Sequence, residues 1–310
     1  MARYVIMRIL MMIPMLLIVI FIVSFIMSLT PSDPGTLILG ERATPEAVAE
    51  VNQKLGYNDP FLVRYSRYVI RAAQGDLGNS WKSGTPVITE IVRRFPTTVT
   101  LAAGAVFIGL VVGMTLGILS AVKQYSYLDI AGTSFAMILA SFPGFWIGMM
   151  LIILFSLKLG LLPSFGNGSW KHFVLPWFTT SCVFIASMLR MTRTSMLEAI
   201  RMDYIRTARA KGQLERVVIT RHALRNALLP VVTILGMEFG ALLGGTVTIE
   251  TVFSLPGVGS LIIEAIRMKD IPVVVGATVT LATCFTLIML FVDILYAFID
   301  PRIKARYMKR

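Results

Sequence analysis

Long apolar stretches alternate with polar segments along this chain, and six of the stretches are long enough to cross a membrane. They cover residues 9–29, 97–122, 130–157, 173–189, 228–249 and 271–299. A helix rises about 1.5 Å per residue, so a hydrocarbon layer of about 30 Å takes roughly 20 apolar residues. The pattern therefore predicts six transmembrane helices, of which the fourth is the shortest.

The composition agrees with a membrane protein. Of the 310 residues, 56% are hydrophobic and 15% are charged, whereas soluble domains carry about 25% charged residues. The first apolar stretch follows Arg3 and Arg8, as the core of a signal peptide would. It exceeds the usual length of about 7 to 15 residues, however, and no A-x-A-like cleavage site follows it. We therefore expect an uncleaved first helix.

The distribution of Lys and Arg predicts the orientation. If the N-terminus is cytoplasmic, the inner loops and termini hold more than half of the 29 Lys and Arg residues, and the whole net charge of +12 falls on the inner face. Short loops rich in Lys and Arg stay on the cytoplasmic side of a membrane. We therefore expect both termini in the cytoplasm, and the positive charge indicates the inner leaflet rather than nucleic acid as its partner.

The segment between the first two stretches, residues 31–96, is polar and lies outside in this orientation. Residues 45–55 carry a helix start signal, and residues 61–73 have an aliphatic and aromatic spacing suited to the membrane surface. The segment is small and balanced in charge, which argues against an enzyme domain. We expect it to form a cap over the external mouth.

Glycines recur at every fourth position in two of the predicted spans. They are Gly109, Gly113 and Gly117 in the second span and Gly236, Gly240 and Gly244 in the fifth; the third span adds Gly144 and Gly148. In lipid, helices associate through close backbone approach, which such ridges permit. The ridges are consistent with packing around a translocation path or a second membrane subunit, and equally with helix contacts inside one subunit.

Ionisable residues are scarce in the predicted spans. Glu238 and Asp293 are the clearest, and such groups are functional candidates by default. Glu238 fits either the lining of a path or a buried hydrogen-bonded acid, whereas we expect Asp293, near the cytoplasmic end, to pair with Arg302 or its neighbours. The cysteines and histidines are isolated from one another, which gives no support for a disulfide or a metal site.

The most informative polar segment is residues 190–230. Its apolar residues at helical spacing are Leu197, Ile200, Tyr204 and Ala208. They predict one face of an amphipathic helix that ends at Gly212, followed by a second helical stretch over residues 214–226. Such a basic helix can lie on a membrane, but its apolar face is thin and its tip is small and polar, which favours insertion into a groove on another protein.

This segment resembles the coupling loop of ABC importer permeases, in the form used by the dipeptide, oligopeptide, nickel and glutathione class. That form reads D-Y-[IV]-R-T-A-R-A-K-G, and residues 203–212 read DYIRTARAKG. Further similar segments are HALRNALLPVVT at 222–233, ETVFSLPGVG at 250–259, VDILYAFIDPRIK at 292–304, and SLTPSDP and GDLGNSW near the N-terminus. The resemblance covers nearly the whole chain.

The resemblance implies an all-α membrane protein with the type I ABC importer permease fold: six transmembrane helices and a cytoplasmic coupling helix. It divides the chain into a first helix with an external segment (1–96) and a core permease domain (97–310) with the coupling loop at 190–227. The residues that it places at the ATPase contact are Glu198, Asp203, Tyr204, Arg206, Thr207, Ala208, Arg209, Ala210, Lys211 and Gly212.

The implied function is that of a permease subunit in the bacterial inner membrane, which imports di- or oligopeptides or similar small solutes. Its partners would be a second homologous permease subunit, two ABC ATPases and an extracytoplasmic solute-binding protein. The chain contains no G-x-x-x-x-G-K-[ST] loop, so ATP and magnesium would bind to the ATPases and this chain would not be an enzyme.

Other functions remain open on the sequence alone. Within the same class, the alternatives are a nickel, metallophore or glutathione importer. From other classes, an ion-driven secondary transporter would show internal repeats and midplane ionisable residues, and we find no repeat and few such acids. An exporter or a receptor-like membrane scaffold is a further alternative, which a requirement of uptake for ATP and a binding protein would exclude.

Overall fold

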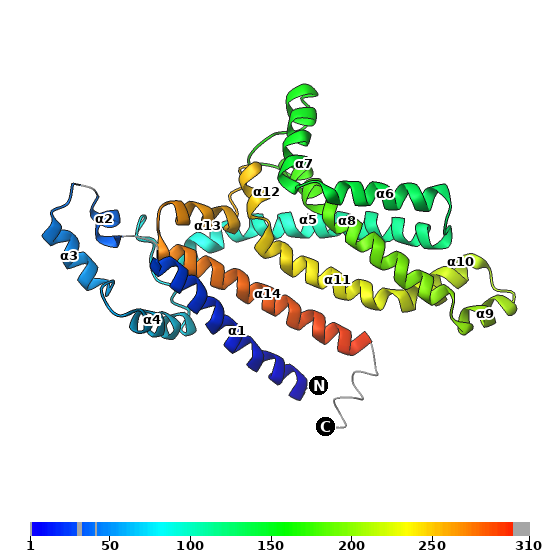
Figure 1. The fold of residues 1–310 in the computed structure, drawn as a ribbon, viewed down its shortest axis with the longest axis horizontal. Coiled ribbons are helices and arrows are strands. Elements are labelled where there is room, and N and C mark those ends of the chain that lie inside the picture. The colour runs from blue at the N-terminus through cyan, green and yellow to red at the C-terminus, as the bar shows by residue number, and fades with distance from the viewer. Residues whose placement is uncertain (1, 30–32, 41, 300–310) are drawn as a thin grey trace.

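The computed structural model describes residues 2–29, 33–40 and 42–299, and this part of the chain is an elongated helical assembly (Figure 1). Helices α2 (Pro34–Leu39), α3 (Pro45–Lys54) and α4 (Phe61–Ala73) lie at one end. The segment around α9 (Asp203–Ala210) lies at the opposite end. The two polar regions of the sequence are therefore separated by the full length of the apolar helices.

The helices of the end segment begin where local chemistry favours a start. The Asp33 side chain accepts the backbone N–H of Thr36, and the Thr44 side chain accepts that of Ala47. Each of the two helices then has proline in its first turn, where a missing N–H does no harm. Helix α4 packs against α1 (Ala2–Leu29), and Tyr65 donates a hydrogen bond to the carbonyl of Leu17 (3.2 Å).

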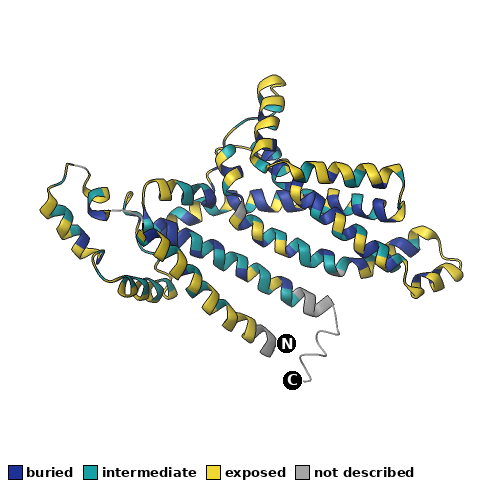
Figure 2. Ribbon diagram, in the orientation of Figure 1, coloured by how far each residue is buried: buried dark blue, intermediate teal, exposed yellow. Residues whose placement is uncertain are grey.

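The centre of the assembly is the pair formed by α5 (Val87–Val122) and α8 (Lys171–Ile200), with α11 (Leu224–Gly245) and α14 (Ile271–Ile299) beside it. Figure 2 shows buried positions concentrated along α5 and α8, whereas α1 is mostly exposed. Apolar side chains that face outward on α1 suit contact with lipid.

The glycine ridges lie mostly at contacts between helices of this same chain. A Cβ on Gly109 would lie 1.9 Å from Phe184, and one on Gly113 would lie 2.8 Å from the carbonyl oxygen of Ile185, both in α8. On α11, a Cβ on Gly236 would lie 2.0 Å from Val292 of α14. Gly117 and Gly240 are similarly close to α8 and α14, whereas Gly244 has no atom within 4 Å. These glycines allow close packing within one subunit.

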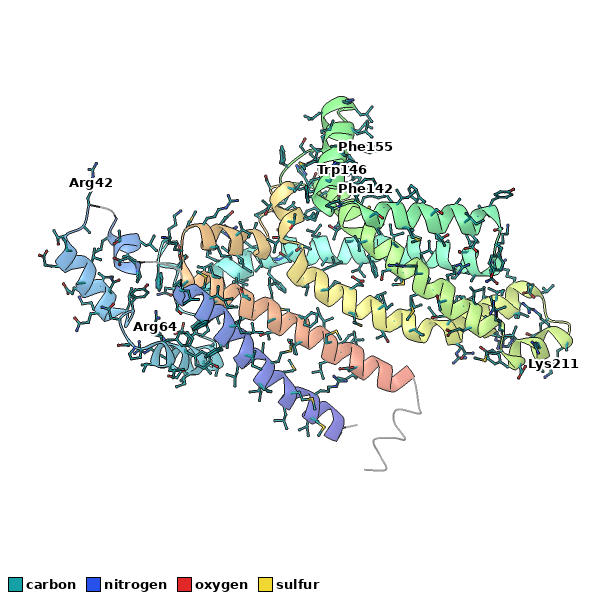
Figure 3. All side chains as sticks on the ribbon, viewed as in Figure 1. Arg42, Arg64, Phe142, Trp146, Phe155 and Lys211 are labelled. Atoms are coloured by element: carbon teal, nitrogen blue, oxygen red, sulfur yellow. The ribbon has the colours of Figure 1, made fainter. Side chains whose placement is uncertain are left out.

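The third predicted span, residues 130–157, is bent in the structure. Helix α6 (Tyr127–Ser141) is followed by α7 (Gly144–Leu151) and a π-helical segment (Ile152–Lys158) at an angle of 99°. Phe142 precedes Pro143 and is extended (ψ 139°), because a residue before proline avoids the helical region. Phe142 stacks on Trp146 at this corner (ring centroids 4.6 Å apart; Figure 3).

Two other predicted spans have different boundaries. Helix α5 begins at Val87, before the predicted residue 97, and the expected division at residue 96 falls inside it. Helix α8 continues past the predicted residue 189 to Ile200: Thr192, Ser195 and Met196 are buried there, and Arg193 is paired with Asp129. Among the described residues, four helices can each cross a membrane, and two bent pairs bring the number to as many as six.

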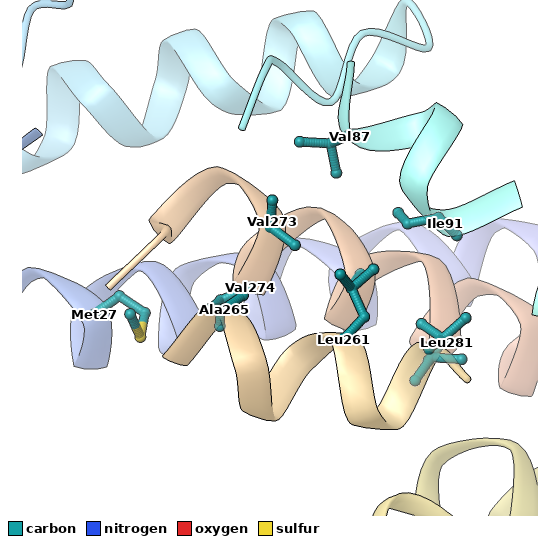
Figure 4. Close-up of a cluster of buried hydrophobic side chains, with 10 residues drawn as sticks. Met27, Val87, Ile91, Leu261, Ala265, Val273, Val274 and Leu281 are labelled. Atoms are coloured by element: carbon teal, nitrogen blue, oxygen red, sulfur yellow. The ribbon is translucent and has the colours of Figure 1, made fainter. Parts of the chain in front are cut away.

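After α11 the chain forms two short helices, α12 (Val247–Val252) and α13 (Val258–Arg267), before it enters α14. Figure 4 shows the buried cluster that this arrangement creates, with Val87 and Ile91 of α5 against Leu261 of α13 and Leu281 of α14. Segments far apart in the sequence thus share one apolar core at the end of the assembly that carries α2–α4.

The α5 ridge leads to a stability prediction. We expect Gly113→Ala to lower the stability of the purified protein by about 1–3 kcal/mol, because its Cβ would lie 2.8 Å from the carbonyl oxygen of Ile185 and 2.8 Å from the Cβ of Met188, and neither atom is the far end of a flexible side chain. Gly132→Ala in α6 is the matched control, because no atom lies within 4 Å of the added carbon. Thermal unfolding in detergent measures both, and equal melting temperatures for the two variants would contradict the packing role.

Candidate functional site

The segment that resembles a coupling loop forms a separate short helix at the end of the assembly. Helix α8 ends at Ile200, residues 201–202 turn, and α9 begins at Asp203. The continuous helical face predicted from Leu197 to Ala208 is therefore wrong. An acidic residue in the first turn of α9 is favourable beside the helix dipole, and this supports a new helix start at this point.

One side of α9 is anchored in the protein. Ile205 is 0% exposed and Ala208 is also buried, in an apolar cluster with Met196 of α8 and Val218 and Ala223 of the following segment. That segment comprises α10 (Glu215–Val217) and a π-helical stretch (Val218–Ala223) that runs directly into α11. Helix α9 therefore shares one buried cluster with the end of α8 and with the segment that leads into α11.

The other side of α9 is exposed. Its exposed residues are Asp203, Tyr204, Arg206, Thr207, Arg209 and Ala210, followed by Lys211 and Gly212. Arg209 makes a two-pronged ion pair with Glu215 (2.6 and 3.1 Å), which raises the pKa of Arg209. The ion pair between Arg206 and Asp203 is longer (3.7 Å). Glu198 is exposed on the last turns of α8. Lys211 projects at the tip (Figure 3).

The chain reverses at Gly212. Its backbone has φ of +74°, and its N–H bonds to the carbonyl of Arg209 (2.9 Å). Only glycine adopts this conformation without strain. Two side-chain hydrogen bonds then hold the returning chain: Gln213 with His222 (2.7 Å), and Asn226 with Tyr204 (3.0 Å). The result is a compact projection with a basic tip.

An ion pair that the sequence analysis did not find lies behind this projection. Asp129, at the start of α6, is 3% exposed and binds Arg193 of α8 through both carboxylate oxygens (2.8 and 2.9 Å). Ser120 of α5 also hydrogen-bonds to this carboxylate, and the backbone N–H of Tyr125 donates to it (2.9 Å). The pair ties three helices together. In the sequence, the one indication of this ion pair is the position of Asp129 directly before the apolar stretch 130–157.

We expect Asp129→Asn to lower the melting temperature of the purified protein by about 5 °C or more, because Arg193 loses its buried carboxylate partner. Asp203→Asn is the matched control, since the Asp203 side chain is 97% exposed. Thermal unfolding of the two variants side by side tests this expectation, and an equal melting temperature for wild type and Asp129→Asn would contradict it.

A second buried carboxylate lies at the other half of the assembly. Glu250 of α12 is 0% exposed. One of its oxygens accepts hydrogen bonds from Thr98 of α5 (2.7 Å) and Thr246 (3.0 Å). The other oxygen accepts the backbone N–H of Ser260 in α13 (2.8 Å). Thr98 in turn accepts the N–H of Val258 (2.9 Å), so this group joins α5, α12 and α13.

The turn after α12 closes tightly around Glu250. A Cβ on Gly257 would lie 2.3 Å from the carboxyl carbon of Glu250, and one on Gly259 would lie 2.9 Å from its oxygen. The segment ETVFSLPGVG at 250–259 was selected in the sequence analysis only for its resemblance to the permease class. The structure shows that it forms the loop around the Glu250 carboxylate. Sequence reasoning missed the role of Glu250 because its partner Thr98 lies far away in the chain.

The two acids that the sequence selected lie elsewhere. Asp293 pairs with Arg8 of α1 (3.0 Å); the expected partner Arg302 lies outside the described residues. The beginning of α1 and the end of α14 are therefore at the same end of the assembly. Glu238 is half-buried on α11 and makes no hydrogen bond or ion pair with the described part of the chain. The structure does not bring Glu238, Asp293 and the α9 residues together.

Comparison with known proteins identifies the class of this fold. The MetNI methionine ABC transporter, solved in inward-facing conformations, contains a chain that is similar with a TM-score of 0.59 at 20% identity, over 69% of this chain and 97% of that one. An amino acid ABC transporter has a similar chain with a TM-score of 0.52. The fold is therefore the type I permease fold of ABC importers.

The family follows from the sequence matches. The family described as binding-protein-dependent transport system inner membrane component matches residues 113–305, and the model for the N-terminal region of such membrane components matches residues 1–102. The chain belongs to this family, which confirms the resemblance found in the sequence.

Two relatives cover almost the whole chain. The dipeptide transport system permease protein DppB of Alkalihalophilus pseudofirmus is 40% identical over 98% of this chain and 100% of its own length. The glutathione transport system permease protein GsiC of Salmonella paratyphi A is 42% identical over 98% of this chain and 99% of its own length. This chain is thus a membrane permease subunit of a binding-protein-dependent importer.

Proposed function

We propose that this permease imports di- or oligopeptides, or glutathione, and is driven by ATP hydrolysis in two partner ATPases. The observation that carries the proposal is the exposed basic tip of α9 on a base that is buried against α8 and the start of α11. The near full-length similarity to a dipeptide permease and to glutathione permeases supports the solute class. A nickel or metallophore solute remains the alternative within the same class.

The geometry of α9 supports a mechanical role. A cleft between the lobes of an ATPase would hold the exposed side of α9, with Arg206 and Lys211 free to pair with acids on that surface. Arg209 is less available, because Glu215 already neutralises it. When the ATPases close, α9 moves as a rigid body and shifts the long helices that it contacts, so that the path opens to one side and then to the other.

The remaining partners follow from the same proposal. A second homologous permease subunit would complete the path, and an extracytoplasmic solute-binding protein would deliver the solute to the end that carries α2–α4. ATP and magnesium would bind to the ATPases. The α9 end, which is rich in Lys and Arg, would face the cytoplasm together with both termini, in the bacterial inner membrane that the family description names.

Reconstitution of the assembled complex in proteoliposomes tests the function. We expect uptake of dipeptides or glutathione that requires ATP, both ATPases and the binding protein. Each candidate solute, including a nickel chelate, is compared at equal concentration, and the solute that stimulates ATP hydrolysis identifies the class. Uptake driven by an ion gradient without ATP would contradict the proposal.

A further inference from the structure

A cavity of about 630 Å³ lies at the end of the assembly opposite α9. Its walls come from α4, from the loop that follows it, and from the neighbouring ends of α1 and α14. Residues that define its position are Ser24 and Ser28 of α1, Arg64 and Tyr68 of α4, Lys82 of the loop, and Val275 of α14. Arg64, which lines the cavity, and Lys211, at the α9 tip, lie at opposite ends of the assembly (Figure 3).

The polar wall of this cavity carries unbalanced positive charge. Arg67 and Arg71 also line it, but each is paired with a carboxylate, of Asp59 (2.5 Å) and Asp76 (3.2 Å) respectively. Arg64 is different: it has no carboxylate partner within the described residues, and its Nε is buried without a hydrogen bond there. An unpaired cation in a partly enclosed site favours an anionic ligand.

The groups beside Arg64 would complete an anion site. The guanidinium group of Arg64 lies over the ring of Tyr57 (5.2 Å to the centroid), which holds it in place. The Tyr68 hydroxyl is buried and has no hydrogen-bond partner in the described part of the chain. Burial raises the pKa of Tyr68, so the phenol keeps its proton and can donate a hydrogen bond to an anion. Lys82 also lines the cavity, and its ammonium group has no carboxylate partner among the described residues.

Apolar side chains form another part of the cavity wall. Ile271 and Val275 of α14 form part of the wall, together with Phe61 and Leu77. The outward face of α1 next to it is exposed and apolar, including Ile22 and Phe25 of the same helical region. Tyrosine and tryptophan side chains at the cavity, among them Trp81, are typical of the boundary between lipid and water.

We propose that this cavity binds the headgroup of an anionic phospholipid from the outer leaflet, with the phosphate at Arg64 and Tyr68 and the acyl chains along α1. A basic pocket between helix ends at the membrane boundary is suited to lipid headgroups. A free phosphate ion would use the same polar groups but would leave the apolar wall uncovered. A peptide carboxylate is the other anion available, and its binding is one outcome of the test.

Native mass spectrometry of the full complex, titrated with phosphatidylglycerol, tests the proposal. We expect Arg64→Gln to reduce the occupancy of phosphatidylglycerol about tenfold, because it removes the positive charge that faces the phosphate. We expect Tyr68→Phe to reduce the occupancy about threefold, because it removes one hydroxyl donor. Arg42→Gln is the matched control: it removes an exposed arginine from the same end segment that does not line the cavity (Figure 3). Its occupancy should equal that of wild type.

Three competitors show whether the cavity recognises a phospholipid rather than an uncharged lipid, a free phosphate ion or a peptide carboxylate. Diacylglycerol, which lacks the phosphate, should not displace phosphatidylglycerol, and neither inorganic phosphate nor an Ala-Ala dipeptide should do so at the same concentration. Equal occupancy in wild type, Arg64→Gln and Tyr68→Phe would overturn the proposal, as would displacement by any of the three competitors. If Arg64→Gln does not assemble, Tyr68→Phe decides, because it removes only a hydroxyl group.

Discussion

Replacing Gly212 with Glu is expected to reduce uptake to less than about a tenth of the wild-type rate while the permease stays in the membrane. Any side chain strains the backbone here, because φ is +74°, and left-handed conformations cost non-glycine residues roughly 1–2 kcal/mol. The new carboxylate would also stand beside Lys211 at the basic tip. ATP hydrolysis by the complex and solute uptake are measured together in proteoliposomes, and hydrolysis should persist without uptake.

Gly75→Glu is the matched control for this variant. Gly75 also follows a helix, bonds through its N–H to the third residue before it (3.0 Å), and has a positive φ of +84°. Like Gly212, it has no atom within 4 Å of an added Cβ. It lies at the opposite end of the assembly, so the same chemical change should leave coupling intact. Normal uptake by Gly212→Glu, or an equal loss in both variants, would contradict the coupling role of α9.

Removing the Glu250 carboxylate is expected to have the second large effect. We expect Glu250→Ala to lower stability by about 3 kcal/mol or more, because the hydroxyls of Thr98 and Thr246 and the N–H of Ser260 lose a common acceptor in a buried site. Glu250→Gln keeps the shape and one acceptor oxygen, so its loss should be smaller. Thermal unfolding of the purified protein ranks the two variants.

Gly257→Ala tests the same site from its other side. Its Cβ would lie within 2.4 Å of the Glu250 carboxylate atoms, whereas the Cβ of Gly244→Ala meets no atom within 4 Å. We expect Gly257→Ala to destabilise the protein and Gly244→Ala to leave its stability within about 1 kcal/mol of wild type. A Glu250→Ala variant as stable as wild type would show that the carboxylate does not organise the loop.

The sequence by itself determined the class of this protein. Apolar stretches of membrane-spanning length depend only on local composition, and the ten-residue segment DYIRTARAKG lies within one loop, so both are visible without a fold. Gly212 was also predictable as a helix end, because its conformational freedom is a local property. The family matches and the fold confirm this class.

Only the tertiary structure decided how the pieces meet. The third span bends at Pro143, α9 separates from α8 at residues 201–202, and Asp293 pairs with Arg8 across the length of the chain. The partners of Asp129 and Glu250 are likewise distant in sequence. Hydrophobic periodicity indicates which side of a helix avoids water. In a membrane, however, the lipid-facing side and the protein-facing side of a helix are both apolar, so the periodicity does not identify the neighbouring helix. The choice of neighbours therefore depends on shape and on single polar contacts, which the pattern does not contain.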